Sequence, residues 1–153
     1  MNKEQEYEKF KEFFMKFIDN KPNSFHPLVW INGKPKIGKN VSIGFFSEIN
    51  AKGSNVEIED NCDIASFVAI NVADSHKRCI GLSKEIEREP IKIGKNVFIG
   101  SHCFIGGGTK IGHHSVIGKG VILNKEEIPP FSLVTSNPLK VRKGYYKEKL
   151  KKD

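Results

Sequence analysis

The stretch IKIGKNVFIGSHCFIGGGTKIGHHSVIGKGVIL, residues 91–123, decides the fold because a large aliphatic residue returns at every sixth position. The recurring residues are Ile93, Ile99, Ile105, Ile111, Ile117 and Leu123. An amphipathic helix would space its apolar residues by three and four, and a half-buried strand would space them by two. A strict period of six instead indicates a coil of short strands around a shared interior.

The same period extends towards the N-terminus, and a second position repeats with it. The upstream members are Ile31, Ile37, Ile43, Ile49, Ile58, Ile64 and Ile70. A small or β-branched residue follows four positions later at Val41, Ser47, Cys62, Val68, Val97, Cys103, Thr109, Ser115 and Val121. Stacked coils would bury both sets in columns, which is how repeat proteins build one core from weak units. Glycine after many of the isoleucines is expected to give the corners their backbone freedom.

This Ile-Gly-x-x-Val-x pattern resembles the hexapeptide-repeat family. The resemblance implies an all-β protein: a left-handed parallel β-helix, shaped as a triangular prism with three hexapeptides in each turn. The handedness comes from the resemblance, because right-handed crossovers are the general rule for parallel strands.

Two interruptions of the period are informative once three hexapeptides make a turn. Ile49 and Ile58 are nine residues apart, and Ile70 and Ile93 are 23 apart. Counted in threes from Ile31, both insertions fall at the same corner of the prism. A long excursion from a compact solenoid is usually functional.

We expect a single domain over residues 1–153, in which the β-helix spans 31–134 with the loop 71–90 inserted. An N-terminal helix is predicted over 2–20, with Asn2 and Gln5 spaced as in a capping box. Its apolar stripe is expected to cover the open end of the prism or a neighbouring subunit. The basic tail, residues 138–153, is predicted to form a short helix.

Composition is that of an ordinary globular protein, with 38% hydrophobic and 28% charged residues. The polar start Met1–Glu6 lacks the apolar segment of a secretory signal, and no long apolar run exists, so we expect a cytoplasmic protein. Three cysteines without a C-x-x-C pair argue against a disulfide framework and a cysteine zinc site. We expect Cys62, Cys79 and Cys103 to be small buried residues.

The net charge of +7 is concentrated in the C-terminal tail. Such a cluster is typical of a solvated tail, a nucleic-acid patch or a seat for phosphates. Few aromatic residues are interleaved with it, which ranks nucleic-acid binding low. Gly106–Gly108 lacks the pattern of a phosphate-binding loop and is interpreted as a corner of a coil.

The long loop carries the candidate chemistry. A single histidine in a loop is more often surface decoration than catalyst, but His76 lies near the root of this loop. Asp74 and Asn71 are close enough in sequence to fix its tautomer by hydrogen bonding. An imidazole is suited to accept a proton at neutral pH, so His76 is a candidate general base.

Residues 90–143 resemble the sugar and xenobiotic acetyltransferases among hexapeptide proteins. The segment Pro90-Ile-Lys-Ile-Gly-Lys-Asn-Val-Phe-Ile-Gly100 carries the resemblance, with Phe98 where many relatives have tryptophan. It implies acetyl-CoA as co-substrate, His76 as general base, and a homotrimer with sites between subunits. It assigns cofactor contacts to Gly100, Ser101, Lys119, Asn124, Lys125, Lys140, Arg142 and Lys143. We further expect a backbone amide at the Gly100–Ser101 corner to hold the oxyanion. Leu139 stands where relatives commonly have alanine, which puts the contacts near the tail in doubt.

The predicted function is therefore acetyl-CoA-dependent acetylation of a sugar, foremost N-acetylation of a nucleotide-linked amino sugar for surface polysaccharide. O-acetylation of a sugar or a xenobiotic is the alternative. A zinc protein like the γ-class carbonic anhydrases ranks lower, because no two histidines are five residues apart, and no metal is expected. A non-catalytic trimeric scaffold also ranks lower, since a scaffold has no need of the long loop.

Overall fold

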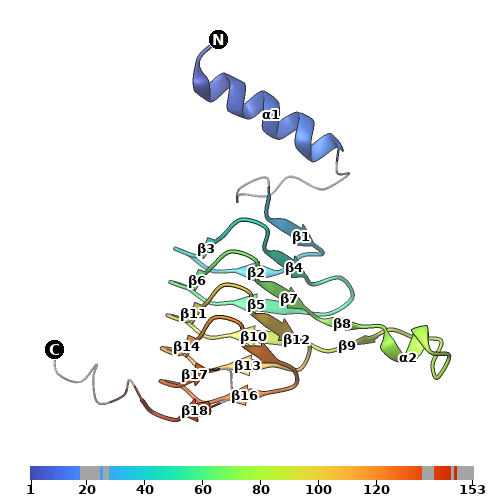
Figure 1. Ribbon diagram of the computed structural model, residues 1–153, viewed down its shortest axis with the longest axis vertical. Coiled ribbons are helices and arrows are strands. Elements are labelled where there is room, and N and C mark those ends of the chain that lie inside the picture. The colour runs from blue at the N-terminus through green and yellow to red at the C-terminus, as the bar shows by residue number, and fades with distance from the viewer. Residues whose placement is uncertain (18–24, 26–27, 136–139, 146, 148–153) are drawn as a thin grey trace.

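The computed structural model describes residues 1–17, 25, 28–135, 140–145 and 147. Three sheets, parallel except for the last strand β18, wind around one axis as a solenoid, and helix α1 (Lys3–Phe17) precedes them (Figure 1). Sheet A contains β1 (Trp30–Asn32), β4 (Glu48–Asn50), β7 (Ala69–Asn71), β12 (Phe104–Gly106) and β15 (Ile122–Leu123). Sheet B contains β2 (Lys36–Ile37), β5 (Val56–Ile58), β10 (Ile91–Ile93), β13 (Lys110–Ile111) and β16 (Glu127–Ile128). Sheet C contains β3 (Ser42–Ile43), β6 (Asp63–Ile64), β11 (Phe98–Ile99), β14 (Val116–Ile117), β17 (Leu133–Thr135) and β18 (Lys140–Arg142).

The register of the strands confirms the six-residue pattern. In sheet A, Ile49 pairs with Ile70, Ile70 with Ile105, and Ile105 with Leu123. These four side chains are almost wholly buried, and so are the small residues that precede their strands, among them Cys103. The predicted β-helix of stacked triangular coils is therefore confirmed.

The corners differ from the expectation in one respect. Gly100 has no positive φ; it is needed because a Cβ there would stand 2.6 Å from the backbone nitrogen of Lys119 in the next coil. The left-handed conformation falls two residues later, on His102, and in other coils on Asn96 and Phe46. Glycine thus permits close stacking of the coils, while the left-handed turn falls on non-glycine residues at many corners and on Gly108 and Gly120 at two others.

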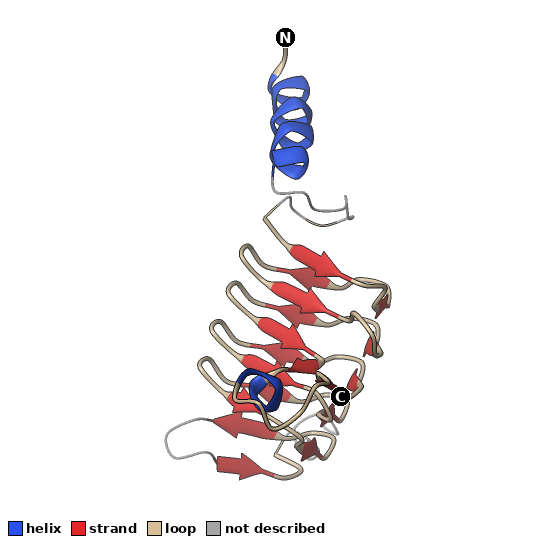
Figure 2. Cartoon of the chain, turned by 90° about the vertical axis from the view of Figure 1, so that its right-hand side faces the viewer, coloured by secondary structure: helices blue, strands red, loops and turns tan. Residues whose placement is uncertain are grey.

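Both insertions lie at the corner between sheets A and B, as predicted. The short one joins β4 to β5 and the long one joins β7 to β10. The long loop is a hairpin of β8 (Ala73–Asp74) and β9 (Glu87–Arg88), which pair antiparallel. Helix α2 (His76–Cys79) lies beyond β8, so the hairpin projects from the side of the solenoid (Figures 1 and 2).

The two ends depart from the prediction more than the coils do. The capping box is confirmed: Asn2 Oδ1 accepts a 2.9 Å hydrogen bond from the Gln5 amide, and the Asn2 amide donates to Gln5 Oε1 at 3.1 Å. However, α1 extends away from the β1 end of the solenoid and does not lie across it (Figure 1). Residues 18–20 of the predicted helix lie outside the described residues.

At the other end the expected helical tail is wrong over 140–142, which form β18 and pair antiparallel with β17. Pairing satisfies backbone groups of the last coil that a helix would have left open. Residues 136–139 and 148–153 lie outside the described residues. Within the described ranges, no helix combines the length and apolar character needed to cross a bilayer.

Candidate functional site

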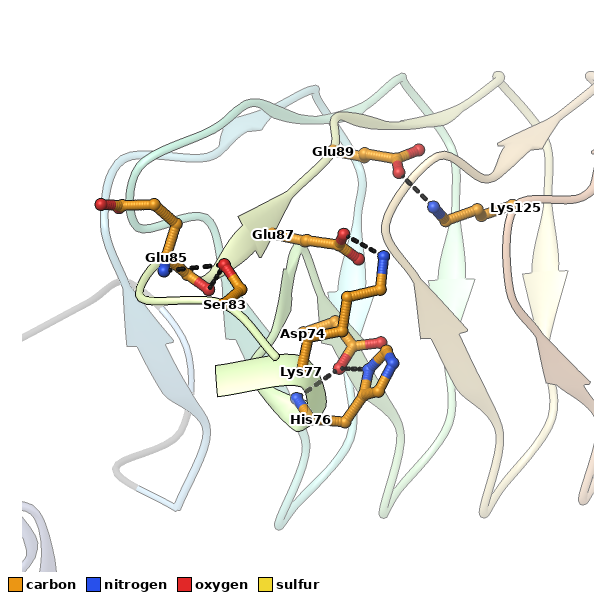
Figure 3. A network of polar contacts seen from close by, with 8 residues as sticks. All are labelled: Asp74, His76, Lys77, Ser83, Glu85, Glu87, Glu89 and Lys125. Carbon is orange, nitrogen blue, oxygen red and sulfur yellow. Dashed lines mark hydrogen bonds and ion pairs between the residues drawn. The ribbon is translucent and has the colours of Figure 1, made fainter. Parts of the chain in front are cut away.

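The long loop holds His76 against Asp74. Asp74 is the last residue of β8 and His76 is the first residue of α2. One carboxylate oxygen, Asp74 Oδ1, contacts both the backbone N–H and the ring of His76. It accepts the His76 backbone N–H at 3.0 Å and lies 2.6 Å from Nδ1 (Figure 3). The two hydrogen bonds from His76 lower the pKa of the Asp74 carboxyl below its ordinary value. An ionised carboxylate only accepts, so Nδ1 must carry the proton and Nε2 is left as a base.

Asn71 is nearby but has other partners than His76. Its side-chain oxygen accepts a hydrogen bond from Asn50 Nδ2 at 3.2 Å and from the Ala73 amide at 2.9 Å. Asn50 and Asn71 are paired residues of β4 and β7, so they form two rungs of an amide ladder on sheet A. The expectation that Asp74 orients the ring agrees with this geometry, whereas the Asn71 oxygen is engaged by the coil and the loop root.

A hollow of about 480 Å³ brings these residues together. Its lining includes all three candidate catalytic residues and one candidate cofactor contact, Asn124. The remaining wall is made by Ala73, Ser75, Cys79, Phe104, Gly106 and Gly107. Cys79 is exposed on α2, contrary to the expectation of three buried cysteines; Cys62 and Cys103 are buried.

Lys125 adjoins Asn124 and lies near Asp74, but the other expected cofactor contacts lie apart from this hollow within one chain. Gly100, Ser101 and Lys119 lie at the corner between sheets C and A, at the opposite ends of β12 and β15 from Asn124 and Lys125. Lys140 and Arg142 belong to β18, at the edge of sheet C, and Lys143 follows it. A single chain therefore does not gather the predicted cofactor residues around His76.

Two further details correct the expectations for individual cofactor residues. The Gly100 amide donates to the Ile117 carbonyl at 2.8 Å, so it is occupied by the ladder and unavailable to an oxyanion. Lys125 Nζ lies 2.5 Å from Glu89 Oε1, an ion pair that sequence reasoning missed because its two members are 36 residues apart. Glu89 could have been predicted as the partner of Lys125 only by knowing that the long loop ends at the same corner, between sheets A and B, at which it begins.

The remaining histidines lie away from the loop. His113 and His114 occupy the corner between sheets B and C, with their Nδ1 atoms 2.9 Å apart. His102 stacks on Phe67 at the corner between sheets C and A. Among the residues the structure describes, no three His, Cys, Asp or Glu side chains are grouped so as to hold a metal.

Comparisons with known proteins agree with this architecture. Residues 90–125 match the family described as bacterial transferase hexapeptide (six repeats). A galactoside acetyltransferase in complex with coenzyme A is 26% identical, with a TM-score of 0.57 over 95% of this chain and 84% of that one. The polySia specific acetyltransferase NeuO is also 26% identical, with a TM-score of 0.59 over 75% of this chain and 56% of that one.

A mutant of AntD, an N-acyltransferase from Bacillus cereus bound to dTDP-4-amino-4,6-dideoxyglucose and coenzyme A, shares the fold at 19% identity. Its TM-score is 0.68, over 88% of this chain and 80% of that one. The comparison with curated proteins found no match. Residues 90–125 are thus transferase hexapeptide repeats, within a chain that has the fold of coenzyme A-binding acetyltransferases, and this similarity supports an acyltransferase.

Proposed function

We propose that the protein transfers the acetyl group of acetyl-CoA to a sugar, with His76 as the general base. One observation carries the proposal: the long loop holds an imidazole against a carboxylate at the edge of a hollow of about 480 Å³. Histidine oriented by a carboxylate is a common arrangement for taking a proton from an attacking hydroxyl or amine.

In the proposed reaction, His76 Nε2 accepts a proton as the acceptor oxygen or nitrogen attacks the thioester carbonyl carbon. The resulting tetrahedral intermediate collapses with breakage of the C–S bond, and the sulfur leaves as the thiol after taking up the proton. Asp74 holds the ring and stabilises the imidazolium that forms between the two steps.

The amide ladder suggests a second role in this step. Because the Asn71 oxygen accepts from Asn50, its carboxamide nitrogen is turned to the next rung of sheet A. That rung is Gly106, which has no side chain and lines the hollow together with Asn71. We propose that Asn71 Nδ2 donates to an oxygen of the acceptor or of the intermediate, which replaces the predicted contact with His76.

Sheet A is the proposed seat of the pantetheine arm. Its outer row includes Phe104 and exposed Ile122, an apolar surface between the corner of Ser101 and Lys119 and the corner of Asn124. We propose that Lys140, Arg142 and Lys143 meet the phosphates. Because one chain keeps these groups apart from His76, we propose a homotrimer in which neighbouring subunits complete each site.

The acceptor is proposed to be a nucleotide-linked amino sugar, acetylated on nitrogen in the cytoplasm for surface polysaccharide. Its support is the AntD fold, solved with a nucleotide-linked amino sugar. The alternative is O-acetylation, supported by the galactoside acetyltransferase at higher identity.

A thiol-release assay tests the proposal directly. Acetyl-CoA is supplied with nucleotide-linked amino sugars, neutral sugars and chloramphenicol-type drugs in turn. We expect thiol release with a sugar, and His76→Ala should lower kcat by about a hundredfold or more, the lower end of general-base assistance. His114→Ala, at another corner, is the matched control. The proposal would be contradicted if none of the tested acceptors gave thiol release, or if the His76→Ala variant had normal turnover.

A further inference from the structure

The root of the His76 loop rests on a glycine corner of the fourth coil. The two legs of the loop are joined by a 3.1 Å hydrogen bond from the Glu89 amide to the Val72 carbonyl. Both legs pass directly over Gly107, where a Cβ would stand 2.8 Å from the Val72 oxygen and 3.1 Å from the Glu89 oxygen. The Gly108 amide donates to the Pro90 carbonyl at 3.0 Å. Glycine is therefore required at position 107, because a larger residue would collide with the two legs of the loop.

An ion pair fastens the same root to the fifth coil. Lys125 follows β15, and its ammonium lies 2.5 Å from the Glu89 carboxylate (Figure 3). A second pair, Lys77–Glu87 at 2.6 Å, links α2 to β9 within the hairpin. Pairing with Glu89 raises the pKa of Lys125, so the ammonium is charged throughout the neutral range.

We infer that Gly107 and the Glu89–Lys125 pair form a seat that fixes the position of His76 over the hollow. All three are positioning residues that act through the loop, and the inference rests on the proposed function only for its kinetic consequence. The seat joins the two legs of the loop to the fourth and fifth coils of the solenoid. His76 is only four residues beyond Val72, so a displaced root carries the imidazole with it.

This role differs from the cofactor contact that the family resemblance assigns to Lys125. Glu89 already neutralises the ammonium, so a CoA phosphate would have to displace a carboxylate at 2.5 Å. Removing a cofactor contact raises the KM for acetyl-CoA, whereas removing a positioning contact lowers kcat. The two roles therefore separate in a kinetic experiment.

The first test uses Lys125→Ala, Glu89→Gln and the double exchange of Glu89→Lys with Lys125→Glu. An exposed pair of this kind contributes modestly, so each single variant should lower kcat about two- to fivefold, with the KM for acetyl-CoA nearly unchanged. The exchanged pair should recover most of the loss. Lys92→Ala is the control, because Lys92 is a similarly exposed, ion-paired lysine on sheet B. A higher KM with unchanged kcat, or no recovery on exchange, would overturn the inference.

The second test adds a readout that does not depend on activity, amide hydrogen exchange. Gly107→Ala must push both legs away, and we expect it to lower kcat about ten- to a hundredfold, as small misplacements of catalytic groups do. Amide hydrogen exchange over residues 73–89 should become several-fold faster in Gly107→Ala and in the single pair variants, while exchange in β11 and β14 stays as in the unmodified protein. Unchanged exchange in the loop of all these variants would refute the seat. Faster exchange in a protein without acetyl transfer would instead preserve the seat and refute the proposed function.

Discussion

At the scale of single residues, the tautomer of His76 is set by Asp74, two positions earlier in the sequence. Asp74 Oδ1 receives both the backbone N–H and a ring contact of His76, and these bonds lower the pKa of its carboxyl. The carboxylate therefore stays ionised at pH values where an ordinary aspartate begins to protonate. A carboxylate held on Nδ1 fixes the tautomer in which Nε2 is the proton acceptor.

Glu48 offers a prediction about stability and pH. It lies in the outer row of sheet A between Trp30 and Ala69, and burial raises the pKa of its carboxyl. A raised pKa means that the folded state favours the protonated form, so this group costs stability as pH rises through that pKa. Glu48→Gln should therefore raise the melting temperature at pH 7 and leave it nearly unchanged below the ordinary glutamate pKa. A lower melting temperature at pH 7 would contradict this sign.

The sequence was sufficient for some residues of the site and insufficient for others. The Asp74–His76 contact is local, since its members are two positions apart in the sequence, and it was predictable. Asn50, the cross-coil partner of Asn71, and Glu89, the partner of Lys125, lie 21 and 36 residues away, so these contacts depend on which coil lies next to which. Gly107 could be recognised as a corner, but the loop legs above it become visible only in the folded chain.

At the scale of elements, the period of six predicted the strands because each strand buries a large aliphatic residue at the equivalent inward-facing position. Ile111 and Lys110 are neighbours on β13 with opposite environments: Ile111 is 2% exposed, while Lys110 belongs to the charged outer row. Ile111→Ala should lower the free energy of unfolding by about 2–5 kcal/mol, measured by urea denaturation. Lys110→Ala is the matched control and should change it by less than about 0.5 kcal/mol. Equal losses in both variants would contradict an inward column of isoleucines.

The elements at the two ends were less predictable. The capping box of α1 is local and was found, but where the helix lies is decided by contacts that no local pattern contains. For 140–142 the basic composition suggested a helix, whereas pairing with β17 continues sheet C by one strand. An unpaired strand edge at the end of a solenoid outweighs a weak helical preference.

At the scale of the whole molecule, the three faces of the prism differ in chemistry. The outer row of sheet B is charged: Lys36, Glu57, Lys92, Lys110 and Glu127. Over the last three coils, sheet C turns Phe98, Val116 and Leu133 outward, and sheet A turns out Ala69, Phe104 and Ile122. Trp30 and Glu48 precede them in the outer row of sheet A. Aromatic Phe46 and Phe67 stack at the corner between these two faces and are exposed. Contiguous apolar surface of this kind is typical of interaction sites, so we expect neighbouring subunits to meet here and leave sheet B in solvent.

Ile122 tests that arrangement, because its side chain is 70% exposed in the single chain and adds nothing to the buried column. We expect the unmodified protein to have three times the 17.2 kDa chain mass in light scattering. Ile122→Glu should give a smaller species with an unchanged β-sheet circular dichroism spectrum, since a charge in a packed interface loses its hydration without a partner. Lys110→Glu, on sheet B, should leave the mass unchanged. An Ile122→Glu variant that keeps three times the chain mass would contradict this interface, and an active single chain would show that each prism holds a complete site.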